Sequence, residues 1–220
     1  MADQIVEKYW SRFAATYDGN QERVVGQELL DEIKQNMKNL SDLGEVLELG
    51  CGTGYFTESI IQKADHIFVT DLSEELLVSA KKRLQNNDKI IIQKENAMST
   101  SFSSNKFNTV FMANLIHVIE NPLKVLQECY RILKEDGLLI IASFTNQGMK
   151  PLEIIKLGFR YIKVWGKPPQ YTHRFSADSL GSLMESVGFS IEESKLLGDR
   201  TKSLYLIGRK KMPNEDIKAT

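Results

Sequence analysis

The first 40 residues carry apolar side chains at helical spacing. A broad stripe predicts one helix over residues 3–17, and it consists of Ile5, Val6, Tyr9, Trp10, Phe13 and Tyr17. A second amphipathic pattern predicts a helix over residues 21–40, which ends at Ser41-Asp42-Leu43-Gly44. We therefore expect a helical N-terminal segment over residues 1–40.

From residue 45 onward, short apolar runs alternate with helical spacing. The runs predict strands at residues 46–49, 66–70, 90–93, 107–113 and 138–144. Helical spacing begins again at Phe56, after Ser73 and at Leu123, and Ser73 is a suitable N-cap. Alternating strands and helices favour an open, mainly parallel sheet with helices on both faces.

The last third of the chain adds two helical patterns and two strands. Residues 151–164 have helical spacing, which the sequence Trp165-Gly166-Lys167-Pro168-Pro169 interrupts. Ser176 is the predicted N-cap of a helix that Gly188 ends. Strands at 189–194 and 203–208, joined by a short loop, predict an antiparallel pair. The predicted fold class is α/β: a doubly wound, Rossmann-like seven-stranded sheet, mostly parallel, with an antiparallel C-terminal edge strand.

A glycine-rich loop follows the first predicted strand, with the sequence Gly50-Cys51-Gly52-Thr53-Gly54. Glycine can adopt positive φ and lets a ligand approach the backbone closely. A strand that leads into such a turn places a ligand at the carboxyl end of the sheet. The dinucleotide fingerprint Gly-x-Gly-x-x-Gly would need a glycine where Tyr55 stands, so a bound pyrophosphate is disfavoured.

Asp71 ends the second predicted strand. An ionised carboxylate accepts two hydrogen bonds, which suits the two hydroxyls of a ribose. Binding sites for several nucleotide cofactors share this feature, so Asp71 predicts that a ribose is bound but does not identify the cofactor. A helix-capping or turn role for Asp71 is the alternative.

Several motifs in order along the chain carry a family resemblance. The string Glu48-Leu49-Gly50-Cys51-Gly52-Thr53-Gly54 resembles the nucleotide-site loop of class I S-adenosylmethionine-dependent methyltransferases. Tyr17-Asp18 resembles the end of the N-terminal lid of the small-molecule members, and Arg131-Ile132-Leu133-Lys134 is similar to their turn into strand five. Residues 9–210 as a whole resemble the ubiquinone/menaquinone-biosynthesis type. The departures are Asn96, where an aspartate is frequent, and Glu135-Asp136-Gly137, where Pro-Gly-Gly is usual.

The resemblance implies a site for S-adenosylmethionine, which would leave as S-adenosylhomocysteine. It implies that the glycine loop contacts the methionine part, that Glu48 orients the loop or the ammonium group, and that Tyr17 closes the lid. It also implies that Asp71 binds the ribose. The complete set of implied cofactor-binding residues is Tyr17, Glu48, Gly50, Cys51, Gly52, Asp71, Leu72, Asn96, Ala97, Asn114 and Leu115.

The implied reaction is an in-line SN2 methyl transfer that depends mainly on positioning, because the sulfonium methyl is already activated. A general base is needed only for a protonated acceptor, and the candidates are His117 and His173. A structural role for His117 and a plain surface position for His173 are the alternatives. The segment 146–175 would enclose an apolar or aromatic small molecule with its ring-bearing residues Phe159, Tyr161, Trp165, Tyr171, His173 and Phe175.

Composition narrows the partners and the location. Hydrophobic residues make up 42% of the 220 residues and charged residues 26%, as in globular proteins. The net charge of −1 gives no basic footprint for nucleic acid. Cys51 and Cys129 form neither a disulfide framework nor a zinc motif, so we expect no metal. We expect a cytoplasmic protein without a membrane span or an N-terminal signal, and either a monomer or a homodimer.

Two other functions stay open at this point. One is a nucleotide-cofactor oxidoreductase, which Tyr55 and the closing antiparallel pair disfavour. The other is a non-catalytic module that binds S-adenosylmethionine. The predicted organisation is a helical lid over 1–40, a cofactor-binding core over 41–145, an insertion over the acceptor site at 146–175, a C-terminal helix and closing strands of the same domain at 176–210, and a charged tail over 211–220.

Overall fold

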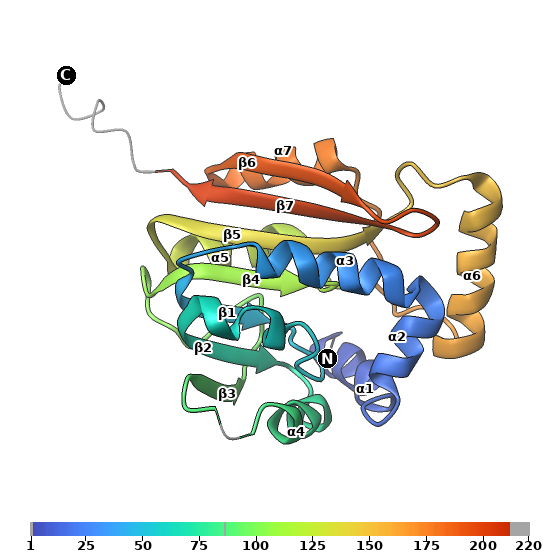
Figure 1. Ribbon diagram of the computed structural model, residues 1–220, viewed down its shortest axis with the longest axis horizontal. Helices are drawn as coiled ribbons and strands as arrows, with labels where there is room; N and C mark the ends of the chain where they lie inside the picture. The colour runs from blue at the N-terminus through green and yellow to red at the C-terminus, as the bar shows by residue number, and fades with distance from the viewer. Residues whose placement is uncertain (1, 86, 212–220) are drawn as a thin grey trace.

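A computed structural model describes residues 2–85 and 87–211, and its centre is a seven-stranded sheet with the strand order β3-β2-β1-β4-β5-β7-β6 (Figure 1). Six strands run in one direction, and β7 is antiparallel to both of its neighbours. The predicted fold class is confirmed. The bounds are β1 Gly44–Leu49, β2 Ala64–Asp71, β3 Ile90–Lys94, β4 Phe107–Ala113, β5 Leu133–Thr145, β6 Phe189–Leu197 and β7 Lys202–Lys210.

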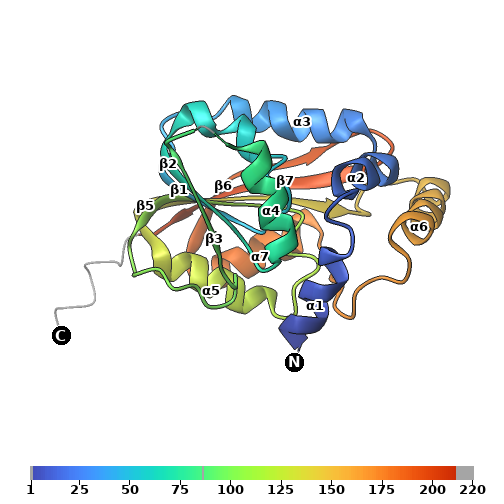
Figure 2. The same cartoon turned by 90° about the horizontal axis from the view of Figure 1, so that it is seen from below.

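Helices cover both faces of the sheet (Figure 2). Alternate residues of each strand point to opposite faces, so Val46 packs with α3 and α4 while Leu47 and Leu49 pack with α5 and α7. This produces two apolar cores, one on each side. The helices are α1 Ala2–Ser11, α2 Tyr17–Val25, α3 Gln27–Lys38, α4 Glu74–Arg83, α5 Pro122–Ile132, α6 Pro151–Trp165 and α7 Ala177–Val187.

The predicted helix starts are confirmed by their caps. Ser73 accepts a hydrogen bond from the backbone N–H of Leu76 at the start of α4. Ser176 caps α7 in a reciprocal capping box, and Gly188 ends that helix in the left-handed conformation. Such side-chain acceptors satisfy backbone donors that have no partner inside the helix.

The N-terminal segment is divided differently from the prediction. The expected helix over 3–17 is wrong beyond Ser11, where turns replace it until Tyr17 opens α2. The expected second helix is interrupted at Gly26, whose φ of 92° is incompatible with a continuous helix. Thr201, in the turn before β7, donates its hydroxyl to the carbonyl of Val25 and holds this break against the sheet.

The helix expected after the glycine loop is also wrong. Two 3₁₀ turns, η1 Thr57–Ser59 and η2 Ile61–Lys63, take its place. The hydroxyl of Thr57 donates to the buried carboxyl group of Glu48 at 2.6 Å, which keeps this connection close to β1. The chain then enters β2 at Ala64, directly after η2.

Two further details lie outside the reach of local patterns. The turn expected at 134–137 is a bulge inside β5, where Asp136 has a φ of 60° and the pairing with β4 shifts register. The prediction that the antiparallel strand forms the C-terminal edge of the sheet is wrong, because β7 pairs on both sides, with β5 and with β6, and β6 forms the edge. Residues 212–220 of the predicted tail, and Met1, lie outside the described residues. Within the described part, no helix is both long and apolar enough to cross a membrane.

Candidate cofactor and acceptor site

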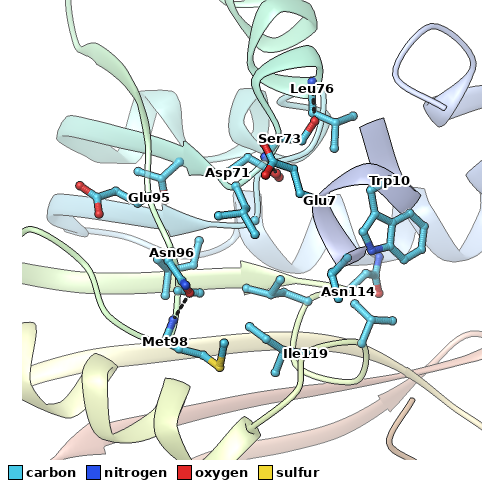
Figure 3. Close-up of a pocket in the computed structure, with 18 of the residues that line it drawn as sticks. Glu7, Trp10, Asp71, Ser73, Leu76, Glu95, Asn96, Met98, Asn114 and Ile119 are labelled. Carbon is cyan, nitrogen blue, oxygen red and sulfur yellow. Dashed lines mark hydrogen bonds between the residues drawn. The ribbon is translucent and has the colours of Figure 1, made fainter. Parts of the chain in front are cut away.

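A cavity lies at the carboxyl ends of β1, β2 and β4, beneath helix α1 (Figure 3). The loops that follow β2, β3 and β4 contribute most of its wall. Eight of the predicted cofactor residues belong to this wall: Tyr17, Gly50, Asp71, Leu72, Asn96, Ala97, Asn114 and Leu115.

Asp71 connects the end of β2 to the glycine loop. Its carboxylate accepts one hydrogen bond from the backbone N–H of Gly52 and one from that of Ser73, both at 2.9 Å. Burial raises the pKa of Asp71, and these backbone N–H groups lower it in part. Each carboxylate oxygen keeps a lone pair for a further donor.

The glycine loop is shaped by close contacts. Gly50 and Gly52 have φ values of 67° and 58°, and a Cβ on Gly50 would lie 2.9 Å from a methyl group of Leu115. A Cβ on Gly52 would lie 3.4 Å from the ring of Tyr17. Gly50 therefore faces the cavity, whereas Gly52 lies against the ring of Tyr17 outside the cavity wall. Cys51 is buried and also lies outside this wall.

Glu48 is almost fully buried and points away from the cavity toward η1. Burial raises the pKa of Glu48 to about 8, against the opposing effect of the Thr57 hydroxyl. This position suits orientation of the loop and places the carboxyl group away from any ligand in the cavity.

Asn114 follows β4 and has two unusual features. Its φ of 58° lies in the left-handed region, and its backbone N–H donates to the carbonyl of Ala142 at 2.7 Å. Both polar atoms of its side-chain amide are buried without a hydrogen-bond partner among the described residues. A strained backbone and an unpaired amide at a cavity wall indicate a position that is held for a ligand.

On the opposite wall, Asn96 uses its side-chain oxygen to accept from the backbone N–H of Met98 at 2.9 Å (Figure 3). A carbonyl oxygen can accept a second hydrogen bond, and the amide group can donate as well. Sequence reasoning missed several other residues of this wall, namely Glu7, Trp10, Ser73, Leu76, Glu95, Met98 and Ile119. Trp10 and Glu7 were missed because they reach the cavity from α1, far away in sequence.

Tyr17 lies in an aromatic cluster with Trp10 and Trp165, at ring-centroid distances of 6.0 and 5.3 Å. Burial and the nearby carboxylates of Asp71 and Asp18 raise the pKa of Tyr17, so its hydroxyl stays protonated. The N-terminal segment is thereby packed against both the glycine loop and helix α6.

A second cavity of about 320 Å³ adjoins the first. The two share four residues, Trp10, Tyr17, Asn114 and Val118. Helix α6 forms one wall with Ile154, Leu157 and Tyr161, and Phe144 lies on another. Of the ring-bearing residues expected around an acceptor, Tyr161, Trp165 and His173 line this cavity, whereas Phe159, Tyr171 and Phe175 do not.

Both candidate histidines line the second cavity. His117 Nδ1 lies 3.2 Å from the hydroxyl of Ser143, and burial followed by the nearby His173 lowers the pKa of His117 to about 4. The ring is therefore neutral near pH 7. His173 donates from Nε2 to the carbonyl of Ile119 at 2.9 Å, and its backbone N–H donates to the carbonyl of His117 at 2.7 Å.

Comparison with known proteins finds a family match over part of the chain. Residues 47–141 match the sequence profile of the family described as Methyltransferase domain. The chain is similar to the ubiquinone biosynthesis O-methyltransferase of Actinobacillus pleuropneumoniae, with 26% identity over 66% of this chain and 63% of the relative. It thus matches less than two thirds of that relative's length.

Solved structures share the fold. A SAM-dependent methyltransferase from Thermotoga maritima has a TM-score of 0.70 at 24% identity, with 93% of this chain and 99% of the other covered. The [4+2]-cyclase SpnF has a TM-score of 0.76 at 15% identity, with 97% and 98% covered. These structures share the fold, and the profile match covers residues 47–141, which form the part of the chain from β1 into β5. The resemblance to methyltransferases seen in the sequence is confirmed, because residues 47–141 match the profile of the methyltransferase domain.

Proposed function

We propose that the protein transfers a methyl group from S-adenosylmethionine to a small apolar or aromatic acceptor. The observation that carries this proposal is the junction of the two cavities, where Asn114, Tyr17 and Trp10 belong to both walls. A donor held in the first cavity and an acceptor held in the second would meet at this junction.

The first cavity fits the proposed cofactor in its polar groups. Asp71 would accept from the ribose hydroxyls, and Leu72, Asn96 and Ala97 would frame the adenine. The unpaired amide of Asn114 would bind the polar end of the methionine part. When bound, S-adenosylmethionine supplies an electrophilic methyl group.

The residues of the chain would position the acceptor and exclude water from the junction of the two cavities. The apolar second cavity would hold the acceptor against the junction, and the aromatic cluster around Tyr17 would cover it. His117 is neutral near pH 7 and could accept a proton from an acceptor hydroxyl or amine. The hydroxyl of Ser143 would then fix the orientation of its ring.

The test is calorimetric titration with S-adenosylmethionine, S-adenosylhomocysteine and NADH, on the wild type and on Asp71→Asn. We expect micromolar binding of the two sulfur nucleosides, about tenfold weaker in Asp71→Asn because a carboxylate acceptor is lost. Asp65→Asn is the matched control, since Asp65 is an exposed residue of the same strand.

The contrary outcomes are specific. Binding of NADH alone would replace the proposal with a nucleotide-cofactor oxidoreductase. Tight binding of both sulfur nucleosides without methyl transfer to any member of an acceptor panel would favour a non-catalytic binding module. The structural likeness to a [4+2]-cyclase concerns the fold alone, so acceptor assays must also follow changes in the acceptor other than methylation.

A further inference from the structure

Helix α6 exposes an apolar stripe on its outer side. Leu152, Ile155, Phe159 and Ile162 are 60%, 56%, 72% and 60% exposed, and they make up four of the eight exposed large apolar residues among those described. Their spacing of three and four residues places them on one face of the helix. We call these four residues the α6 stripe.

The inner side of the same helix is apolar as well. Ile154, Leu157 and Tyr161 line the second cavity, and Trp165 is buried in the core. A surface helix of a globular protein normally pairs one apolar face with a polar one. The α6 stripe therefore has no role in the packing of the described residues, and an exposed apolar patch of this kind indicates an interaction surface.

Positive charge is concentrated around the stripe. Residues 150–167 contain five Lys or Arg residues and one Glu, although the whole chain has a net charge of −1. Lys156 follows Leu152 by four residues and Lys163 follows Phe159 by four, so both exposed lysines flank the stripe. Lys156 pairs with Glu153 at 2.8 Å, and this partner neutralises only one of the five charges.

We propose that the α6 stripe and its flanking lysines bind the surface of an anionic lipid bilayer. An apolar helix face bordered by Lys and Arg is typical of helices that lie in the plane of a membrane interface. The positive charge complements acidic headgroups. Figures 1 and 2 show α6 at the rim of the molecule, where its outer side can approach a flat surface.

A second copy of this chain is a weaker candidate for the occupant. A helix of 15 residues is about 22 Å long, and its four stripe side chains offer much less than the roughly 800 Å² per partner of a stable interface. Clustered positive charge would also repel the same charge on a copy. A bilayer, in contrast, can bury a narrow apolar stripe, and its acidic headgroups attract the lysines.

Docking has a consequence for the second cavity. Ile162 belongs both to the stripe and to the cavity wall, so the mouth of the cavity would lie against the bilayer. An acceptor dissolved in the membrane could then enter without crossing water. This consequence rests on the proposed function, whereas the docking itself does not.

The test is co-sedimentation of the full chain with vesicles of phosphatidylcholine, with and without phosphatidylglycerol, in the absence of any cofactor. We expect binding to the anionic vesicles that weakens at high salt. Phe159→Asp should weaken binding about tenfold or more. Val78→Asp is the matched control, because Val78 is 64% exposed on α4 and should change nothing.

A charge variant keeps the proposal testable if Phe159→Asp does not fold. Lys156→Glu combined with Lys163→Glu leaves the stripe intact and should abolish the preference for anionic vesicles. Lys38→Glu combined with Lys82→Glu makes the same charge change on α3 and α4 and should retain binding. Circular dichroism of each variant confirms that it is folded.

Three results would overturn the proposal. One is a wild type that does not bind anionic vesicles at low salt. Another is binding that neither the Phe159 nor the lysine variants weaken. The third is a wild-type dimer in sedimentation velocity that Phe159→Asp dissociates, without lipid binding, which would make the stripe an interface between copies. Since no cofactor is present, a failure of the proposed methyl transfer leaves these results unaffected.

Discussion

Glu48 and Asn114 show how burial gives single residues properties that their sequence neighbours do not suggest. Glu48 is an acid inside an apolar core with one hydroxyl donor, and Asn114 is an amide without a partner at a cavity wall. In both cases burial removes a polar group from water, and hydrogen bonds within the protein do not fully replace those that it made with water. These costs lead to predictions that a stability measurement can check.

Glu48→Gln should remove a pH dependence of stability. Burial raises the pKa of the folded carboxyl from 4.5 to about 8, so the folded state binds more protons than the unfolded state between these values. The contribution of the Glu48 carboxyl to the free energy of unfolding is fully present below pH 4.5 and is lost as the pH rises through 8. Urea unfolding should show that the free energy of unfolding of Glu48→Gln rises relative to that of the wild type by on the order of 5 kcal/mol as the pH goes from 4.5 to 8. Equal pH profiles for the two proteins would show that Glu48 is ionised in the fold. Glu45→Gln is the control from the same strand.

Asn114→Gly should stabilise the protein and weaken cofactor binding. Glycine adopts a φ of 58° without strain, and the change removes an unpaired buried amide, so we expect a gain of about 1 kcal/mol in the free energy of unfolding. The same change should weaken binding of S-adenosylhomocysteine about tenfold. Asn105→Gly relieves a similar φ of 53° away from the cavity and should leave the affinity unchanged. Loss of stability in Asn114→Gly would mean that the amide has an internal role.

At the scale of elements, the break between α2 and α3 decides how the N-terminal segment folds over the site. Gly26 allows the chain to turn after Val25, and α3 then packs along the face of the sheet (Figure 2). A continuous helix over 21–40 would carry α2 away from α6, although these two helices are in contact in the fold. Backbone conformation at one position thus sets the place of Tyr17.

Two glycines in this segment allow a paired test. A Cβ on Gly19 or on Gly26 would meet no atom within 4 Å, so packing is equal in the two cases. Gly19 lies inside helix α2, and Gly19→Ala should raise the free energy of unfolding by about 0.5–1 kcal/mol. Gly26→Ala must adopt a φ of 92° and should lower it by about 1–2 kcal/mol. Thermal unfolding of both variants checks the opposite signs, and equal signs would contradict this account of the break.

At the scale of the whole molecule, a polar cluster fastens the N-terminal segment to the core. Arg83, the last residue of α4, donates to the carbonyl of Thr53 at 3.2 Å and to its hydroxyl at 2.9 Å, and it pairs with Asp18 of α2. Thr53 in the glycine loop also donates to Asp18. Three segments far apart in sequence therefore meet beside Tyr17.

Arg83→Met should loosen the attachment of the N-terminal segment to the core, with only a small effect on the free energy of unfolding. An ion pair of this exposure contributes about 1 kcal/mol or less to stability, so unfolding should change little. If the lid then opens more often, the apparent affinity for S-adenosylhomocysteine falls with the closed fraction, and we expect about a tenfold loss. Lys82→Met, next to it on the same helix, is the control. An affinity equal to that of the wild type would show that the cluster does not hold the lid.

The sequence by itself determined the seven strands, their order along the chain and the starts of several helices. Short apolar runs specified the strands, and capping residues such as Ser73, Ser176 and Gly188 specified where helices begin and end. The glycine loop and Asp71 could be placed at the carboxyl ends of strands, because neighbouring residues alone encode a strand followed by a turn. These features depend on contacts within a few residues, which a linear pattern records.

Only the tertiary structure decided the rest, because it depends on which distant surfaces pack together. The position of β7 between β5 and β6 follows from sheet pairing across the chain. Glu48 faces η1 because its parity on β1 directs it to that side of the sheet. Trp10 reaches the cavity because α1 returns over the carboxyl ends of the strands. The outer face of α6 is exposed because nothing among the described residues covers it, and a helical pattern alone cannot distinguish such a face from one that is buried.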